Sequence, residues 1–402
     1  MKNSLYLILL LLLPMLASCV DEYEIKLKEA DMNRLVINGH IVSGETCSFT
    51  LSYSQGVNAY MGWNDGSSQN RVAVMGEDGS VYNARDVKGD FYSSQARYDV
   101  EVGELRDDVR YWLHVETDGQ VYESAPLYPT QAPEIDSLTF RQDMEAPGMP
   151  VDVFVSAAPT AESVYLRWNY DECWEVYTPY TTDVRYDSFA NWVYDIPRSE
   201  WTNHGWARNQ GTVEEIGKTG EFAGNCIRNK FLYRINQLTS ADNRLQTRYR
   251  TRVRQYAISK VEYDYLQLRH RQDTEMGGLF TPLPSELPTN ITCTTDAERK
   301  AVGYIGVSGR PATMEMYIDH SEVTFKRNYT PVYYTDDYMI EEGLVSYFSR
   351  SQRYVLLSHY FEDTMDGGKR EVSTWTEPWC VDCRQYFWGR ASLVKPDDWK
   401  DK

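Results

Sequence analysis

The sequence predicts a mainly β protein, with an N-terminal immunoglobulin-like β-sandwich domain followed by a larger β-rich domain that contains one short helix. Two observations lead to this class. Short runs that alternate apolar and polar residues recur along the chain, and turn signals rich in Gly or Pro separate them. The 402 residues can bury a large core, and an aromatic content of 13% argues against disorder. The net charge of −18 repels phosphate backbones, so we expect no nucleic-acid partner.

Residues 1–18 are interpreted as a lipoprotein signal peptide. The apolar run Leu5–Leu13 follows Lys2 and is too short to span a bilayer, but it is typical of the core of a secretory signal. It ends in Leu16–Cys19, which matches the site where bacterial lipoproteins are cleaved and acylated. We therefore expect Cys19 to carry a lipid that anchors the protein in a bilayer; the alternative is a soluble secreted protein.

Residues 19–33 are expected to form a lipidated acidic tether. The segment Val20–Glu24 resembles the surface-export signal of Bacteroidetes lipoproteins, which implies an outer-membrane protein that faces the cell exterior. A solvated acidic linker is the other interpretation, because a cluster of like charges stays in water in either case.

Residues 34–130 are predicted to form the β-sandwich domain. The alternating runs are Leu35–Ile37, Ser48–Tyr53, Arg71–Met75, Val81–Ala84 and Tyr111–Val115. Asp78-Gly79 and Asp118-Gly119 supply the positive φ that a tight hairpin turn requires. Prolines 126, 129 and 133 then mark a domain boundary.

Residues 134–402 are predicted to form the larger β-rich domain, in which Val151–Val155 and Val164–Trp168 are strands. The helix is expected at about 259–272, because Ser259–Glu262 has the pattern of a capping box. Apolar residues then follow at helical spacing, at positions 261, 265 and 268.

Six cysteines remain after Cys19, and an even number in an oxidising compartment suggests disulfides of undetermined pairing. The structural disulfide candidates are Cys173, Cys226, Cys293, Cys380 and Cys383. The CxxC spacing of Cys380–Cys383 lacks a second CxxC or a nearby His, so a disulfide is favoured over a zinc or redox site. A bond between Cys173 and Cys226 would clamp the base of the segment that they flank.

That segment, residues 174–210, is an excursion dense in aromatic residues and without a clean period. Its candidate ligand- or partner-binding residues are Trp174, Tyr180, Trp192, Tyr194, Trp201 and Trp206. Tyr and Trp are good contact anchors in protein interfaces, but rings also serve burial, so the excursion could instead pack on itself.

A row of four arginines at positions 248, 250, 252 and 254 alternates with other residues, so at strand period all four face one side. Arg250 and Arg252 are therefore candidates for binding a carboxylate or phosphate. The alternative is that the row pairs with acids on adjacent strands.

No motif for catalysis, phosphate binding or metal binding is present, and the six histidines are scattered singly. We expect no catalytic residue, no metal and no cofactor. A hydrolase with carboxylates brought together across strands is the alternative that spacing alone does not test.

The chain resembles a Bacteroidetes lipoprotein family known as domain of unknown function 4249. The segments that carry the resemblance are Cys19–Asp21, Leu35–Gly39, Pro133–Leu138, Gly277–Phe280, Pro284, Pro288–Ile291, Val302–Ile305, Cys380–Arg384 and Lys395–Trp399. The resemblance implies an outer-membrane lipoprotein that assists a TonB-dependent receptor in uptake, and it implies no catalytic residues. We therefore expect a non-catalytic accessory or ligand-binding partner of such a transporter, with a structural or adhesive surface protein as the alternative.

Overall fold

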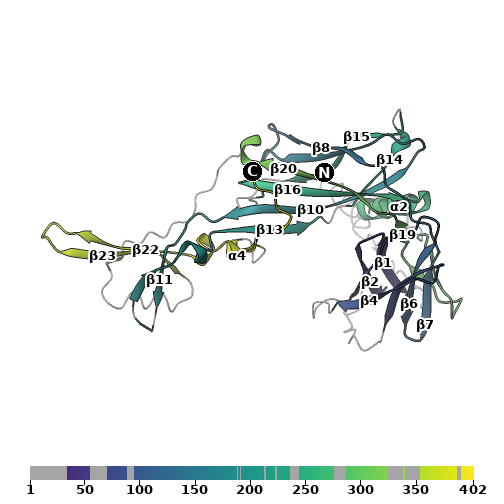
Figure 1. Cartoon of the computed structure of the whole chain (residues 1–402), viewed down its shortest axis with the longest axis horizontal. Helices are drawn as coiled ribbons and strands as arrows, with labels where there is room; N and C mark the ends of the chain where they lie inside the picture. Colours follow the sequence, from purple (N-terminus) through teal and green to yellow (C-terminus); the bar gives the residue numbers. More distant parts are fainter. Residues whose placement is uncertain are drawn as a thin grey trace, which may run out of the picture.

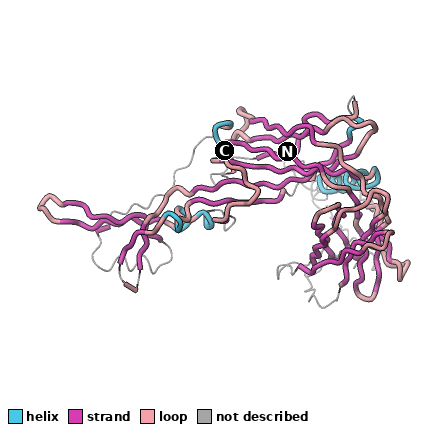
Figure 2. Tube along the Cα trace, in the orientation of Figure 1, coloured by secondary structure: helices cyan, strands magenta, loops and turns pink. Residues whose placement is uncertain are grey.

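The computed structural model describes residues 34–54, 70–87, 95–187, 189–190, 192–211, 214–221, 224–235, 244–275, 287–324, 338–339, 354–386 and 391–402. The expected signal peptide, Cys19 and the tether lie outside these residues, as do Gly277–Phe280 and Pro284. The fold is mainly β, which confirms the predicted class, and strands dominate the trace in Figure 2. Figure 1 shows an elongated molecule: a sandwich at one end, a larger body, and an arm at the other end.

The sandwich begins with seven strands, of which β6 shows the clearest alternation of buried and half-buried residues. They are β1 (Leu35–Val42), β2 (Thr46–Tyr53), β3 (Arg71–Gly76), β4 (Val81–Val87), β5 (Ala96–Glu101), β6 (Tyr111–Thr117) and β7 (Gln120–Ser124). β6 and β7 pair up to Thr117 and Gln120, so Asp118 and Gly119 form a two-residue turn, and both have positive φ. This confirms the hairpin that the Asp-Gly pair predicted.

Three short strands from much later in the chain complete the sandwich. β17 (Ile291–Cys293) pairs antiparallel with β7, whereas β18 (Ala301–Val302) and β19 (Ile305–Ser308) run parallel to β1. Their apolar residues join the sandwich core, so this core is not built from residues 34–130 alone.

The larger body consists of two sheets that face each other across a second core. The six-stranded sheet contains β10 (Tyr165–Tyr177), β13 (His204–Gln210), β14 (Glu215–Lys218), β16 (Arg248–Ile258), β20 (Ala312–Asp319) and β24 (Ala391–Ser392). The three-stranded sheet contains β8 (Ile135–Gln142), β9 (Val151–Ala157) and β15 (Ile227–Ile235). Trp168 is buried between the two sheets, and its indole N–H donates to Gln255 Oε1 at 2.8 Å, so the burial leaves no unpaired donor there.

Helix α2 (Lys260–Glu275) confirms the predicted helix and is the only helix of seven or more residues in the described parts of the chain. The Glu262 backbone N–H donates to Ser259 Oγ at 3.1 Å, which is one half of the capping box. The buried face carries Glu262, Tyr263, Tyr265 and Leu266, which pack against the sandwich, whereas Val261 is exposed. The helix therefore lies at the junction of the sandwich and the body (Figure 1).

The arm is built from two parts of the chain that interrupt the sequence of the body, one between β10 and β13 and the other between β20 and β24. It contains β11 (Val184–Asp187), β12 (Trp192–Asp195), β21 (Tyr338–Met339), β22 (Val355–Asp363) and β23 (Lys369–Thr376). A small core of Val184, Leu356 and Trp375 joins them. Short turns complete the structure: η3 (Arg198–Glu200), η4 (Thr219–Glu221), η5 (His320–Glu322), η6 (Pro378–Cys380) and α4 (Cys383–Tyr386).

Replacing Gly303 by Ala should destabilise the sandwich. Gly303 has φ of 128°, and a Cβ there would lie 1.9 Å from the Ile37 carbonyl oxygen, so both strain and a clash oppose the side chain. We expect the free energy of unfolding in urea to fall by about 3 kcal/mol. Gly79→Ala is the matched control, because Gly79 has φ of 84° with nothing within 4 Å of the new Cβ, so its loss should be about 1 kcal/mol. Equal losses would contradict the close approach.

Candidate functional site

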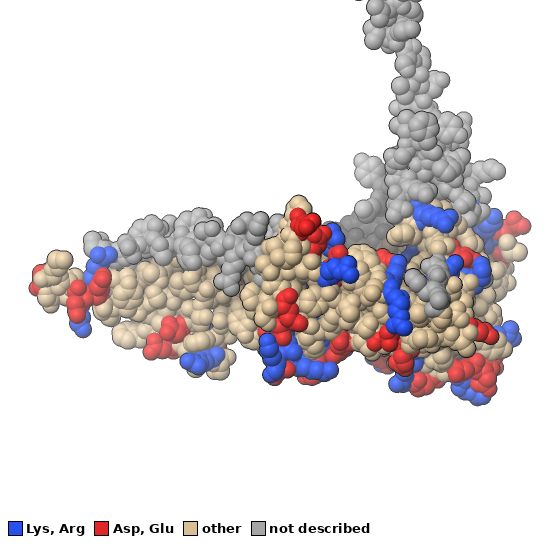
Figure 3. Space-filling model, turned by 90° about the horizontal axis from the view of Figure 1, so that it is seen from above, with Lys and Arg blue, Asp and Glu red and all other residues tan. Residues whose placement is uncertain are grey.

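The arm exposes large apolar side chains on both of its hairpins. On β12, Val193 turns toward the small arm core, so its neighbours Trp192 and Tyr194 point outward, and Trp192 is 69% exposed. The outward apolar side chains of the arm are Phe189, Trp192, Tyr194, Tyr360, Phe361 and Met365; we call this set the arm surface. In Figure 3 the arm shows an uncharged stretch between the charged groups near its far end and the mixed charges of the body. Exposed apolar groups concentrated on one projection are typical of a protein-contact surface.

Backbone hydrogen bonds to the Cys380–Cys383 segment hold the base of the arm. Tyr180 N–H donates to the Cys380 carbonyl at 3.0 Å, and Cys383 N–H donates to the Thr202 carbonyl at 2.8 Å. The Thr202 hydroxyl also donates to the Val381 carbonyl at 3.0 Å. The two chain ends of the arm are thus joined through this segment, without a disulfide.

All six described cysteines, including the candidates Cys173, Cys226, Cys293, Cys380 and Cys383, are buried and carry thiols rather than disulfides. Cys226 lies near the start of β10, because Asn225 accepts a hydrogen bond from Thr160 N–H. Cys173 lies eight residues beyond Tyr165 along that strand, roughly 26 Å at strand rise, which is too far for the expected clamp. Burial raises the pKa of both Cys173 and Cys383 to about 11, so these thiols stay protonated at neutral pH.

The six aromatic candidates separate into different environments, and one expectation is corrected. Trp174 is only 3% exposed and belongs to the second core, because β10 continues through it as a regular strand. Trp192 and Tyr194 belong to the arm surface. Trp206 lies 4.6 Å from His204, which stacks on Tyr177 at 4.2 Å.

The remaining two candidates, Tyr180 and Trp201, are half-buried. Tyr180 lies at the arm base, and Trp201 lies under the Arg198 guanidinium at 5.4 Å. The segment between the end of β10 and the start of β13 is residues 178–203, which is shorter than the expected excursion 174–210 and contains the paired strands β11 and β12.

Arginines of the row form ion pairs with acidic residues of the protein itself. Arg250 is 2% exposed, and its guanidinium lies 3.0 Å from Asp398 Oδ2. Arg252 pairs with Glu315 Oε1 at 2.5 Å and with Asp398 Oδ2 at 2.6 Å. Burial opposes ionisation of both acids, but the arginines outweigh it and hold the pKa of Glu315 and of Asp398 below the usual range. The structure therefore favours the ion-pair alternative over ligand binding by Arg250 and Arg252.

A buried polar cluster at the junction was not expected from the sequence. His40 on β1 places Nδ1 3.0 Å from Glu262 Oε1 on α2, and its Nε2 lies 2.8 Å from Ser308 Oγ on β19. Arg167 on β10 places Nη1 3.6 Å from the same Glu262 oxygen. Burial alone would raise the pKa of Glu262, but His40 and Arg167 outweigh it, and that pKa is lowered.

The order Ser308, His40, Glu262 has the spacing of a hydrolase triad, yet its hydrogen bonds do not support nucleophilic chemistry. The Ser308 hydroxyl donates its proton to the Ala257 carbonyl at 2.7 Å, so it has none to give to His40. Ser308 is also 1% exposed, which leaves no access for a substrate. The cluster is better understood as a structural junction.

No group of three or more His, Cys, Asp or Glu is arranged to hold a metal ion among the residues that the structure describes. Over the same residues, no helix is long and apolar enough to cross a membrane.

The chain belongs to the family of domain of unknown function 4249, whose model matches residues 20–313. This confirms the family that the sequence resembles. No curated protein sequence matches the chain.

Two solved structures are similar at a low level. One is a DUF4785 family protein from Legionella pneumophila, with a TM-score of 0.18, 11% identity, and coverage of 55% of this chain and 52% of that one. The other is trypsin-activated alpha-2-macroglobulin from Escherichia coli, with a TM-score of 0.19, 7% identity, and coverage of 57% and 15%. This chain thus spans about half of the first protein and a small part of the second.

Replacing Glu262 by Gln should destabilise the junction. The change leaves His40 buried without its carboxylate and removes one of the two carboxylates beside Arg167, which keeps Glu214, so the free energy of unfolding at pH 7 should fall by about 3 kcal/mol. Because the folded-state pKa of Glu262 is lowered, its contribution is present above about pH 4.3 and is lost as the pH falls. The measurement is urea unfolding at a series of pH values from neutral to acid. The free energy of unfolding should fall less steeply with decreasing pH in the variant than in the wild type.

The matched control is Glu101→Gln, which removes an exposed carboxylate whose pair with Arg85 spans 3.0 Å. Exposed pairs contribute little, so this variant should follow the wild type at every pH. A Glu262→Gln variant that also followed the wild type would contradict the role of the cluster.

Proposed function

We propose that this protein is a non-catalytic, lipid-anchored protein of the outer membrane that faces the cell exterior and binds a TonB-dependent transporter through its arm. The observation that carries the proposal is the arm surface, which presents aromatic side chains on a projection away from both large cores (Figure 1). Interfaces gain most of their energy from a few aromatic anchors, and Trp and Tyr are the commonest of these.

The geometry of the arm supports a binding role over packing of the excursion on itself. Among the residues that the structure describes, only a few side chains form the arm core, so folding of this part of the arm buries little apolar surface. Trp192 and Phe361 are 69% and 62% exposed, so a partner could bury most of each ring. The arm is joined to the body by backbone hydrogen bonds at its base, which orients the surface before contact and limits the entropy lost on binding.

Replacing Trp192 and Phe361 together by Ala should weaken capture of the transporter from gently solubilised outer membranes by roughly tenfold or more. The measurement is a tagged pull-down of the full-length protein, with the co-purified transporter quantified against the bait. Tyr128→Ala is the matched control, because Tyr128 is an exposed aromatic residue that lies beyond the sandwich strand β7 and is remote from the arm.

Recovery of a transporter in near-equal amount with the wild type, and its loss only with the arm variant, would support the proposal. Recovery of the protein alone would contradict it and favour a structural or adhesive role. Equal recovery with both variants would remove the arm as the contact surface.

The lipid anchor has a separate test. Replacing Cys19 by Ser removes the thiol that would be acylated, so incorporation of labelled palmitate should be lost completely and the protein should leave the membrane fraction. Replacing Cys47 by Ser is the control, because Cys47 is buried in the sandwich core and cannot be acylated there. Unchanged labelling of the Cys19→Ser variant would contradict the anchor.

A further inference from the structure

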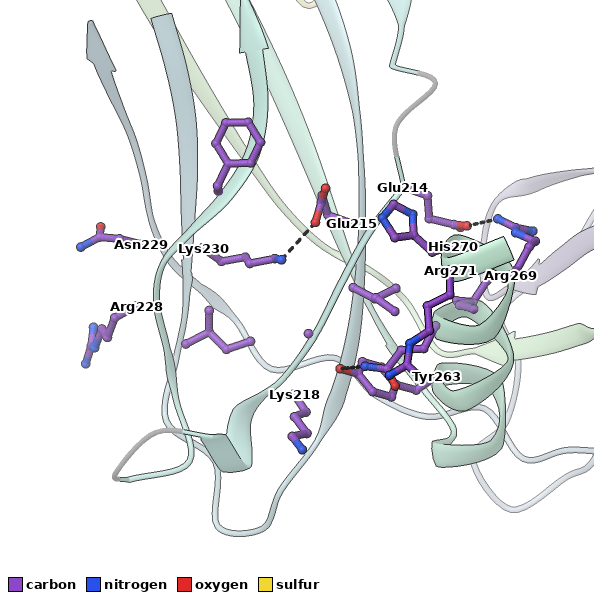
Figure 4. A pocket seen from close by; sticks show the side chains of 16 residues that line it. Glu214, Glu215, Lys218, Arg228, Asn229, Lys230, Tyr263, Arg269, His270 and Arg271 are labelled. Carbon is purple, nitrogen blue, oxygen red and sulfur yellow. Dashed lines mark hydrogen bonds and ion pairs between the residues drawn. The ribbon is translucent and has the colours of Figure 1, made fainter. Parts of the chain in front are cut away.

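A cavity of about 730 Å³ lies beside helix α2, between the strands β14 and β15 (Figure 4). This volume is within the range of small-molecule sites, which is about 300–1,000 Å³. In Figure 4, Lys230 reaches from β15 toward Glu215 on β14, and Arg269, His270 and Arg271 lie on the helix opposite. The cavity is on the body and involves none of the arm.

Two sheet edges form the wall of this cavity. Within the described residues, β14 pairs only with β10, and β15 pairs only with β9. The register of β15 shifts between Ile227 and Lys230, and Asn229 in this bulge has φ of 48°, in the left-handed region. Bulges re-aim side chains and are common beside functional sites. This one exposes Arg228 and Asn229 in succession at the cavity edge.

The charge of the lining is opposite to that of the whole protein. The charged lining residues are Lys218, Arg228, Lys230, Arg269 and Arg271, against Glu214 and Glu215. In a chain with a net charge of −18, this is a local excess of three positive charges, without counting His270. A positive concave site in a negative protein concentrates anions from solution.

The two acids of the lining are already neutralised. One oxygen of Glu214 binds the Arg167 guanidinium and the other lies 2.7 Å from Arg269 Nη2. Glu215 Oε2 lies 3.0 Å from Lys230 Nζ. Outside the lining, Asp136 pairs with Arg228 at 2.5 Å, and this added acid is matched by the added Arg167. Because Arg167 also lies 3.6 Å from Glu262, the excess is two positive charges once all these neighbours are included, again without counting the histidines.

The same cavity also has apolar walls. Ile227, Tyr263 and Leu266 are almost fully buried behind its surface, and Phe231 lies at the lining with 41% of its surface exposed. Gly217 allows β14 to lie close to the Trp168 ring at the back of the cavity, because a Cβ at this position would lie 3.1 Å from that ring. Cations for an oxyanion and rings for an apolar part thus converge on one volume.

We propose that this cavity binds a ligand that carries a phosphate or carboxylate group on an apolar or aromatic body. Lys and Arg side chains bind such oxyanions through charge-assisted hydrogen bonds, and Tyr263 and Phe231 contact the apolar part. The ligand is either a free solute or the headgroup region of a lipid. This inference does not depend on the arm or on the transporter.

The test is calorimetric titration of the purified full-length protein with phenyl phosphate, inorganic phosphate and benzyl alcohol. Phenyl phosphate should bind at least about tenfold more tightly than either of the others, because only it offers both groups. The double variant Lys218→Gln/Arg271→Gln should weaken phenyl phosphate binding by about tenfold or more. Sedimentation with vesicles tests whether the ligand is a lipid headgroup. A lipid anchor on the protein would add the same affinity for phosphatidylglycerol and for phosphatidylcholine vesicles, so a preference for phosphatidylglycerol would come from the headgroup.

The matched control is Arg85→Gln/Lys300→Gln, which removes the same charge from exposed positions of the sandwich. Loss of phenyl phosphate binding in the pocket variant alone supports a free solute. A preference for phosphatidylglycerol that only the pocket variant loses supports a lipid headgroup. Absence of both kinds of binding, or equal loss in the two double variants, would overturn the proposal.

Discussion

Glu262 is a carboxylate with almost no contact with water, and it pairs with side chains from two other parts of the chain. His40 comes from the first strand of the sandwich, Arg167 from the longest strand of the body, and Glu262 from the helix between them. A buried charge without partners costs several kcal/mol, so this cluster specifies how sandwich, helix and body fit together. Gly306 is part of the same constraint, because a Cβ there would lie 2.0 Å from Glu262 Oε2.

The long sheet of the body connects this junction to the arm at the other end of the molecule. β10 has 13 residues, which is about 43 Å at strand rise, and it pairs with β16 over most of its length. Arg167 lies near one end of β10 and Tyr177 at the other, where the arm begins. Because the arginine row of β16 is neutralised by acids of β10, β20 and the C-terminal segment, this long sheet is held by charge as well as by its core. The junction and the arm consequently lie at opposite ends of one long sheet.

The two candidate binding features differ in their chemistry. The arm surface consists of exposed apolar side chains, which suits a protein partner. The cavity beside α2 is concave and positively charged, which suits a small oxyanion. The sequence pointed to Trp192 and Tyr194 of the first through the dense aromatic residues of 174–210, but it did not point to Tyr360, Phe361 and Met365. It did not point to the second, because the cations come from two strands and a helix, and only Arg269–Arg271 form a run that could have been noticed.

Local chemistry determined the mainly β class, the Asp118-Gly119 hairpin and the helix that begins after Ser259, because each depends on residues within a few positions of one another. Tertiary structure decided the burial of Trp174 and Arg250 and the return of residues 291–308 to the sandwich. It also turned the Glu262 side chain from the expected capping box toward His40. A short stretch of sequence does not show which strand pairs in parallel with another or which side chains form an ion pair or a hydrogen bond. His40 and Ser308, for example, are 268 positions apart in the sequence. Only the folded chain brings such groups within bonding distance.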